Sequence, residues 1–389
     1  MRRILLLHNT PKARRYFQAL AAHIHNLDIR VRGIGLRGGP ALAPGEAAQI
    51  AGYTMARKHA RGRIPSWRLR RLQAVHERVA RWHYHSARAQ ILAQRPEAIG
   101  VWGGQSVDAR AALRAAAALG VPAYTFECGL LPRTTTCDPR GVNADNALPR
   151  SPGFYARYDA PAELPRTLLP RAARQPQAAV TLPRRYVFVP LQVRLDSQVL
   201  LYSPWIRDMR HLFAVLTEAR REAGLDDVAL VFKRHPSCRA DYADLERLAA
   251  AMPGVLFANG NPTQALIDNA LGVATINSTV GIEALLLERP VLTLGRACYA
   301  IDGVAASAHG VGEVAAWLRG LAQGTLPVAR HRQAFLHYLA NEYCIPGHHK
   351  SPGPAHYAAL AQQLASHPAD RGQSLWAQPP GAVHGLAAI

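Results

Sequence analysis

Four short segments place polar side chains directly after apolar runs that predict β-strands. They are Glu127-Cys128-Gly129, Gln192 to Ser197, Lys233-Arg234-His235-Pro236 and Asn277-Ser278-Thr279-Val280-Gly281. In open α/β sheets, ligands bind outside the carboxyl ends of the strands. The order of these segments along the chain therefore indicates a binding or catalytic site built from successive strand ends.

Each segment also has a purely structural interpretation. Glu127 could be a solvated loop residue, and Asp196 a turn or N-cap aspartate. The cationic run that contains His235 suits a phosphate, but a strand end that faces solvent would have the same composition. Ser278 or Thr279 is predicted to cap the next helix, and the free N–H groups at such a helix start bind anions.

Several other chemistries lack the residues that they need. No Asp-x-Asp follows a predicted strand, no Gly-x-Gly-x-x-Gly opens a helix, and neither a Walker A motif nor a Gly-x-Ser-x-Gly elbow is present. His83-x-His85 and His348-His349 have no partner cluster at ligand spacing, so we expect no metal. The five cysteines are scattered, and none forms Cys-x-x-Cys, which favours reduced thiols in a cytoplasmic protein.

Strands that alternate with helices must position these segments. Strands are predicted at residues 4–7, 29–34, 98–102 and 121–126, and again at 186–189, 228–232, 255–257, 273–276 and 291–294. Helices are predicted over 66–94, 206–223 and 241–251, and an alanine-rich helix is predicted to end at Leu119. The alternation predicts an α/β protein with two Rossmann-like domains and mostly parallel sheets. Two such domains facing a cleft are the arrangement of GT-B-type sugar transferases.

The domain boundary is predicted in a stretch with five prolines between residues 159 and 185. We expect a first domain over 1–160, a linker over 161–185, a second domain over 186–330, and C-terminal helices with an irregular tail over 331–389. The 389 residues are long enough for two buried cores.

The charge is strongly positive. The chain has 46 Lys and Arg against 26 Asp and Glu, a formal net charge of +20, which favours anionic partners. Only four of the cations are lysine, as a GC-rich genome would produce, so the arginines alone do not indicate nucleic acid. The N-terminal apolar run is too short for a signal peptide, and no 18-residue apolar stretch occurs. We therefore expect a cytoplasmic protein.

Half of the positive surplus lies between Met55 and Arg95, where eleven Lys and Arg face one acid, Glu77. Trp67, Trp82 and Tyr84 lie in the same stretch, and such rings favour a membrane interface. This predicts peripheral attachment to an anionic membrane. In the alternative interpretation, the arginines are simply solvated and one apolar stripe packs on the domain core, formed by Leu69, Leu72, Val75, Val79 and Trp82.

Taken together, the motifs resemble those of the capsular polysaccharide biosynthesis/export family, over roughly residues 100–305. The matching runs are Phe126-Glu127-Cys128-Gly129, Gly141-Val142-Asn143, Leu148-Pro149-Arg150, Leu191-Gln192-Val193, Asp196-Ser197-Gln198, Lys233 to Pro236, Ile276 to Gly281, Pro290-Val291 and Gly295. Cys128, where the family commonly has a second acid, and Leu130, where it has an aromatic, depart from the pattern. Members of this family are bacterial retaining β-Kdo transferases that use CMP-Kdo.

The resemblance implies a role for each candidate residue. Asp196 corresponds to the nucleophile and Glu127 to the acid/base carboxylate, while the CMP site would comprise Lys233, His235, Pro236, Asn277, Ser278, Thr279 and, at the ribose, Glu283. Further candidates from the same motifs are Gln192, Arg194, Ser197, Asn143 and Arg150. The first domain would face the acceptor and the second would bind the CMP-sugar, with no cofactor or metal.

The implied acceptor is an anionic lipid or a glycan, and the implied location is the inner face of the cytoplasmic membrane, with capsule assembly or export proteins as partners. Three alternatives stay open: an inverting CMP-sialic acid transferase, a non-catalytic capsule assembly or export subunit, and a basic nucleic-acid binder. The last would show aromatic residues interleaved with a basic groove, which only the stretch around residues 67–84 offers, so we expect no nucleic acid.

Overall fold

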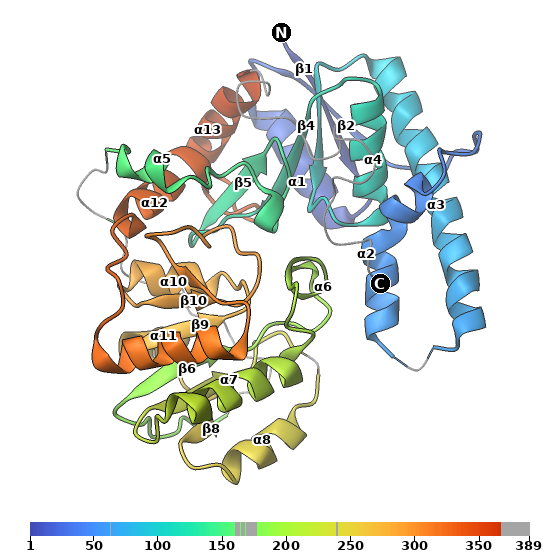
Figure 1. Ribbon diagram of the computed structural model, residues 1–389. Helices are drawn as coiled ribbons and strands as arrows, with labels where there is room; N and C mark the ends of the chain where they lie inside the picture. The colour runs from blue at the N-terminus through green and yellow to red at the C-terminus, as the bar shows by residue number, and fades with distance from the viewer. Residues whose placement is uncertain (63, 160–163, 165–167, 169–176, 239, 367–389) are drawn as a thin grey trace. The chain divides into compact units, whose positions relative to one another are not determined.

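The computed structural model describes residues 1–62, 64–159, 164, 168, 177–238 and 240–366. The chain forms two compact units. Among the described residues, one unit contains those up to Leu148 together with Glu342 to Ser366, and the other contains those from Pro149 to Asn341. Each unit has its own six-stranded sheet (Figure 1).

The first unit is a three-layer α/β sandwich. Its sheet has the order β12-β5-β4-β3-β1-β2. The strands are β1 (Arg3–His8), β2 (Asp28–Gly33), β3 (Ala98–Trp102), β4 (Ala123–Cys128), β5 (Thr134–Asp138) and β12 (Ile345–Pro346). The helices are α1 (Pro11–His23), α2 (Glu46–Ala60), α3 (Ser66–Gln94), α4 (Val107–Ala118) and α13 (Pro354–Ala365), with a short 3-10 turn, η1 (Asn143–Asp145). Strands β1 to β4 are parallel, β5 pairs antiparallel with β4, and β12 pairs antiparallel with β5.

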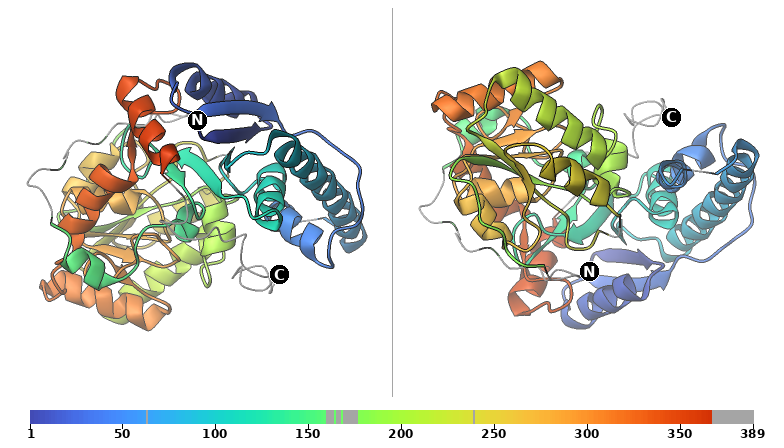
Figure 2. Two further views of the ribbon diagram at one scale, coloured as in Figure 1. Left: turned by 90° about the horizontal axis from the view of Figure 1, so that it is seen from above. Right: turned by 90° about the horizontal axis from the view of Figure 1, so that it is seen from below.

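Alternate side chains of β1 pack into two hydrophobic cores, one on each face of this sheet. Leu5 and Leu7 belong to the core beneath α2, α3 and α4, whereas Ile4 and Leu6 belong to the core beneath α1 and α13. This follows from the two-residue period of a strand, which directs successive side chains to opposite faces. Figure 2 shows the two helical layers on either side of the first sheet.

The second unit has an all-parallel sheet of order β11-β10-β9-β6-β7-β8. The strands are β6 (Tyr186–Pro190), β7 (Ala229–Lys233), β8 (Val255–Phe257), β9 (Gly272–Thr275), β10 (Val291–Thr293) and β11 (Ala306–Ser307). The helices are α5 (Pro152–Ala156), α6 (Ser197–Tyr202), α7 (Met209–Ala223), α8 (Ala243–Ala250), α9 (Thr263–Asp268), α10 (Val280–Leu286), α11 (Val311–Gln323) and α12 (Arg332–Tyr338). Numbered within the unit, the strand order is 3-2-1-4-5-6, the order of a Rossmann fold. The predicted fold class, with mostly parallel sheets, is confirmed.

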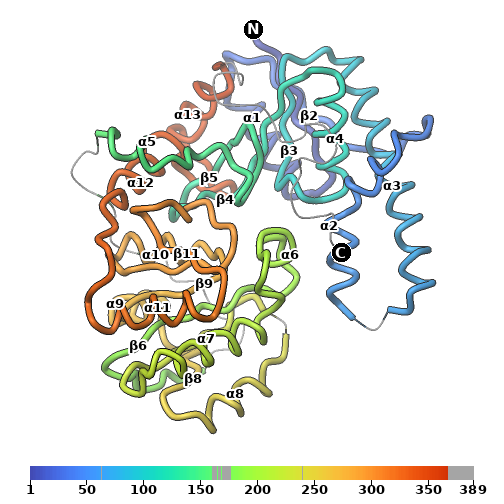
Figure 3. Tube along the Cα trace, viewed as in Figure 1, coloured from blue at the N-terminus to red at the C-terminus, as the bar shows by residue number. Residues whose placement is uncertain are grey.

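The units divide at positions other than those expected from proline content. Residues after Leu148 already belong to the second unit, where Phe154 of α5 packs edge-on against Tyr338 of α12 at 5.1 Å. The chain returns to the first unit through a π-helical turn at Leu339–Tyr343, and β12 then pairs with β5. Figure 3 traces this return to α13 in red. Most of the expected linker, residues 161–185, lies outside the described residues.

Candidate functional site

The second unit brings three of the sequence-predicted segments to one edge of its sheet. Because all six strands are parallel, the loops after β6, β7 and β9 leave the same edge. Strands β6 and β9 are neighbours, and the order of connection reverses between them. In open α/β sheets, such a switch point is where the ligand crevice forms.

Two buried amides join the loops at this switch point. Nε2 of Gln192 donates to Oδ1 of Asn277 at 2.9 Å, and Oε1 of Gln192 accepts from the Asn277 backbone N–H at 3.2 Å. The Asn277 Nδ2 group donates to the carbonyls of Gln198 and Tyr202 at 2.8 and 3.2 Å. Both donors and the oxygen of the Asn277 amide are thus engaged within the protein. Gln192 and Asn277 therefore position the loops, a different role from direct contact with the donor.

Asp196 lies immediately before α6 and caps it. Its Oδ1 accepts from the Gln198 backbone N–H at 2.9 Å and from the Ser197 hydroxyl at 3.4 Å. Among the described residues, no hydrogen bond reaches Oδ2 of Asp196. The N-cap interpretation is therefore confirmed, and it leaves one carboxylate oxygen to act on a ligand.

The loop after β9 is held tightly before α10 begins. The Ser278 hydroxyl accepts from the Val280 N–H at 3.2 Å, and its carbonyl accepts from the Tyr299 hydroxyl at 2.5 Å. A Cβ at Gly281 would collide with the Tyr299 ring, so only glycine fits there. Burial raises the pKa of Tyr299 well above its ordinary value, which keeps it protonated as a donor. Spacing alone gave no signal for Tyr299.

The cationic residues at the end of β7 and just after it have two different roles. The Lys233 ammonium donates to the carbonyls of Asn259 and Asn261 at 2.8 and 2.5 Å, and burial lowers its pKa. Lys233 therefore holds the loop after β8. His235 is half-buried in the loop that follows β7. Its Nδ1 accepts from the Ser237 N–H at 3.1 Å, a contact that orients the ring.

The other predicted residues are spread more widely. Arg194 and Pro236 are half-buried in loops at the same sheet edge, Thr279 immediately precedes α10, and Glu283 lies in its first turn. Arg150 donates to the Cys298 carbonyl at 3.0 Å within the second unit. Asn143, in contrast, begins η1 of the first unit with a positive φ of 60°. Arg150 and Asn143 therefore belong to different units.

Glu127 belongs to the first unit and lies one residue before the end of β4, not after it as expected. Its Oε1 accepts from the Cys128 backbone N–H at 2.8 Å. Its backbone pairs with Thr136 because the strand continues antiparallel to β5. Gly103, in the turn after β3, approaches Glu127 so closely that an added Cβ would lie 3.5 Å from Oε2. The half-buried carboxylate thus lies at the carboxyl end of the parallel strands.

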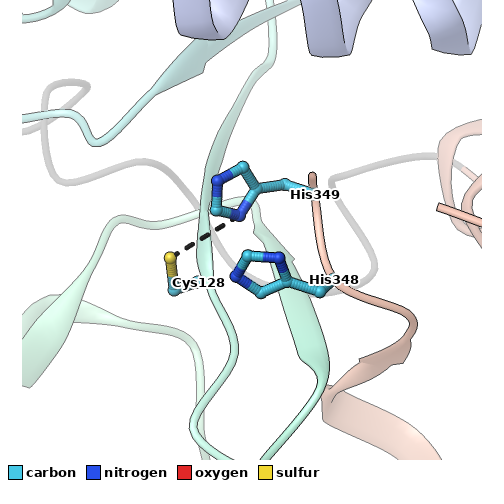
Figure 4. A group of neighbouring side chains, drawn as sticks. All are labelled: Cys128, His348 and His349. Carbon is cyan, nitrogen blue, oxygen red and sulfur yellow. Dashed lines mark hydrogen bonds between the residues drawn. The ribbon is translucent and has the colours of Figure 1, made fainter. Parts of the chain in front are cut away.

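The sequence analysis missed a cluster beside Glu127. The expectation that His348-His349 has no ligand-spaced partner is wrong, because Sγ of Cys128 lies 3.8 Å from Nδ1 of His349. Figure 4 shows the sulfur facing a ring nitrogen of each histidine. Burial, with Lys12 nearby, lowers the pKa of His349 to about 4, and burial, with the charge of Glu127, raises the pKa of Cys128 to about 11. Both groups are therefore neutral at pH 7.

The basic segment, residues 55–95, comprises the end of α2 and the whole of α3, two helices that pack on each other (Figure 1). None of the five stripe residues proposed to pack on the core is fully buried, and Val75 is 55% exposed. The buried side chains of α3 begin only at Ala80. Trp67 is 52% exposed and lies 5.4 Å from the Arg71 guanidinium. The first half of α3 therefore presents aromatic and cationic groups to solvent together.

Comparison with known proteins identifies similar chains. Residues 171–348 match the family model described as "Capsule polysaccharide biosynthesis protein". Protein FixF of Sinorhizobium fredii is 37% identical over 243 residues, which cover 62% of this chain and 59% of FixF. The capsule polysaccharide modification protein LipB of Neisseria meningitidis is 34% identical over 127 residues, which cover 31% of this chain and 30% of LipB. The chain therefore spans less than two thirds of either relative.

One solved structure with a similar chain course is KpsC of Thermosulfurimonas dismutans, described as a β-Kdo 2,7 transferase. It has a TM-score of 0.48 and 13% identity, and the match covers 93% of this chain and 98% of KpsC. Within the described part of this chain, no helix is both long and apolar enough to cross a bilayer.

Proposed function

We propose that the protein is a glycosyltransferase that moves Kdo from CMP-Kdo, with retention, onto a lipid or glycan acceptor. The match of residues 171–348 to the capsule polysaccharide biosynthesis family model supports this proposal. One observation carries the proposal. Asp196, His235 and Ser278 come from three different loops, and all three loops leave the carboxyl edge of the second sheet around its switch point. A CMP-sugar bound there would meet a carboxylate and a phosphate-binding loop together.

Asp196 is suited to act as the nucleophile. Its Oδ1 is held by the start of α6, which fixes the direction of the carboxylate. Oδ2 would attack the anomeric carbon as the bond to the phosphate oxygen breaks, so that CMP leaves with the electron pair. The product of this step is a glycosyl ester on Asp196. Transfer to the acceptor from the opposite face then restores the original configuration.

Glu127 is the proposed base of the second step. CMP departs as a stable phosphate anion, so the first step needs stabilisation of charge more than a proton. The acceptor hydroxyl, in contrast, must lose a proton as it displaces Asp196, and a carboxylate near the reacting centre can accept it.

His235 and the Ser278 loop are the proposed partners of the CMP phosphate. His235 is oriented by the Ser237 N–H, and the Ser278 hydroxyl is held at the start of α10. Hydrogen bonds to a phosphate in a partly desolvated site stabilise the charge that develops on the leaving group. In this proposal, the donor phosphate needs no metal.

Replacing His235 or Ser278 with alanine is expected to weaken CMP binding roughly ten- to hundred-fold, because one charge-assisted hydrogen bond contributes about 1.5–3 kcal/mol. Isothermal titration calorimetry with CMP measures this directly. His211→Ala is the matched control, since His211 is also half-buried in the second unit and its Nδ1 also accepts a backbone N–H. Unchanged CMP affinity in both site variants would remove the phosphate assignment.

The donor is tested by incubating the protein with CMP-Kdo and, separately, with CMP-sialic acid in the presence of lipid and glycan acceptors. We expect CMP release and a product mass increased by one Kdo residue with the first donor alone. Release only from CMP-sialic acid would favour the inverting alternative. Release from neither would favour a non-catalytic assembly subunit.

The first half of α3 supports a further part of the proposal, attachment to an anionic membrane surface. Eleven cations and one acid lie between residues 55 and 95, and Trp67 is exposed among them. Each cation near an anionic bilayer contributes about 1 kcal/mol, so a few engaged arginines suffice for reversible binding. An acceptor built on an anionic lipid would lie at that surface.

Reversing three exposed arginines of α3, in the variant Arg68/Arg70/Arg78→Glu, is expected to abolish co-sedimentation with phosphatidylglycerol vesicles. The native protein should bind these vesicles, less strongly as salt rises, and should not bind phosphatidylcholine vesicles. Arg184/Arg207/Arg247→Glu changes the net charge equally at exposed positions of the second unit and should bind as the native protein does. Equal loss of binding in the two triple variants would indicate a general charge effect and contradict a specific surface.

A further inference from the structure

Cys128, His348 and His349 form a compact set of metal-ligating side chains in the first unit. One candidate ligand atom from each residue lies within 4.8 Å of the other two. The sulfur of Cys128 and Nδ1 of His349 are 3.8 Å apart. Two ligands of one tetrahedral zinc ion, with bonds of about 2.3 Å to sulfur and about 2.0–2.1 Å to nitrogen, lie roughly 3.6 Å apart. The three side chains therefore need only small movements to share one ion.

The chemistry of the donor set narrows the choice of ion. A thiolate and two imidazoles suit zinc and related transition metals, whereas magnesium and calcium require oxygen ligands. Three protein ligands also leave a fourth tetrahedral position for water or another oxygen ligand, as in catalytic zinc sites.

The imidazole of His349 is buried with few hydrogen-bond partners among the described residues. The residue is 6% exposed, and its Nε2 is buried without a hydrogen-bond partner among the described residues. Its ring packs against Trp102 at 4.8 Å, and among the described residues its polar contact is with the Cys128 sulfur, 3.8 Å from Nδ1. Burial of an imidazole with so little hydrogen bonding is costly. Coordination through Nδ1 would give the buried ring a strong polar interaction in place of the long contact with the Cys128 sulfur.

We infer that Cys128, His348 and His349 bind one divalent transition-metal ion of the zinc class, which joins the end of β4 to the segment that follows β12. Cys128 is 220 or more positions from the two histidines in the chain, so local spacing could not reveal the set. This inference replaces the expectation that the protein binds no metal. It holds whichever sugar donor the protein uses.

Of the charges near the cluster, one opposes a bound dication and one favours it. The ammonium of Lys12 lies over the Trp102 ring at 4.7 Å, within electrostatic range of the cluster, and opposes a dication. Glu127, next to Cys128, supplies a compensating carboxylate, and the thiol loses its proton when the metal binds. Cys128 is exposed, which gives the ion a route from solvent.

Because of where its ligands lie in the first unit, the ion is expected to stabilise the folded state. Cys128 is the last residue of β4, and the two histidines follow β12 after one residue, Gly347; β12 is the strand by which the chain rejoins the first sheet. An ion that binds the folded state and not the unfolded state raises the free energy of unfolding. Zinc should therefore raise the unfolding temperature of the native protein.

The test uses the full chain, with any purification tag removed, stripped with a chelator and then titrated with Zn²⁺ or Co²⁺. We expect one equivalent of bound zinc by equilibrium dialysis and elemental analysis. Co²⁺ should give a thiolate-to-metal charge-transfer band with intense tetrahedral d–d bands. Zn²⁺ should also raise the unfolding temperature. Cys128→Ser should lose the charge-transfer band, and both Cys128→Ser and His348→Ala should bind at least ten-fold more weakly.

Both variant positions are at least partly exposed, so the folded state should survive and circular dichroism of the metal-free proteins can verify it. Two control variants, Cys238→Ser and His83→Ala/His85→Ala, remove a thiol and an imidazole pair elsewhere and should retain stoichiometric binding. Absence of stoichiometric binding in the native protein would overturn the inference. So would native-like binding in folded Cys128→Ser and His348→Ala, or equal loss in the control variants.

Discussion

Replacing Asp196 with asparagine is expected to lower the rate of glycosyl transfer by about 10⁴-fold or more, because the substitution removes the nucleophile. Asparagine is chosen because it caps helices as well as aspartate does. The contact from Oδ1 to the Gln198 N–H can therefore persist while the charge is lost. Initial rates of CMP release with CMP-Kdo and acceptor measure the effect.

Asp208 provides a matched control. It caps α7 as Asp196 caps α6, with its Oδ1 accepting from the His211 N–H at 2.9 Å. Asp208→Asn should therefore transfer sugar at close to the native rate. If Asp196→Asn keeps full turnover, or if both variants lose activity equally, the aspartate is only a helix cap.

Replacing Asn277 with alanine is expected to lower the free energy of unfolding by about 2–4 kcal/mol, because several buried polar groups lose their partners at once. The change leaves Nε2 of Gln192 and the carbonyls of Gln198 and Tyr202 without the Asn277 amide. Urea unfolding followed by circular dichroism gives the change. Asn269→Ala, an exposed asparagine with one local contact, should cost little.

The double variant Gln192→Leu/Asn277→Leu separates the amide pair from the rest of the site. Removing both partners leaves no orphaned amide between the two side chains, so the double variant should cost less than the sum of the two single leucine variants. Costs that simply add would show that Gln192 and Asn277 are not coupled, which contradicts the proposed bridge between β6 and β9.

Local sequence patterns predicted most of the strands, because burial and alternation are local properties, but they missed β5, β11 and β12. Strands β3 and β8 and helix α3 begin and end where the sequence predicted. In β1, the alternation of Ile4, Leu5 and Leu6 between two cores is the physical origin of that signal. The polar segments at strand ends were predicted for the same reason, since each follows a run of buried residues.

Contacts between distant parts of the chain left no local signal. The pairing of Ile345 with Thr135 returns the C-terminal segment to the first sheet and moves the boundary away from the proline-rich stretch. The same return places His349 beside Cys128. Lys233 was expected at a phosphate because a lysine after a strand suggests one, yet its partners are the carbonyls of Asn259 and Asn261. Which partner a polar side chain finds depends on tertiary packing.

The central claim is that sugar passes through a covalent bond to Asp196, and one measurement tests it most directly. The protein is mixed with CMP-Kdo without acceptor, quenched rapidly in acid, and analysed by intact-protein mass spectrometry followed by peptide mapping. We expect a mass increase of one Kdo residue on the peptide that contains Asp196, absent from Asp196→Asn. Full turnover of CMP-Kdo by the native protein with no adduct on that peptide, or with an adduct on another residue, would contradict the account.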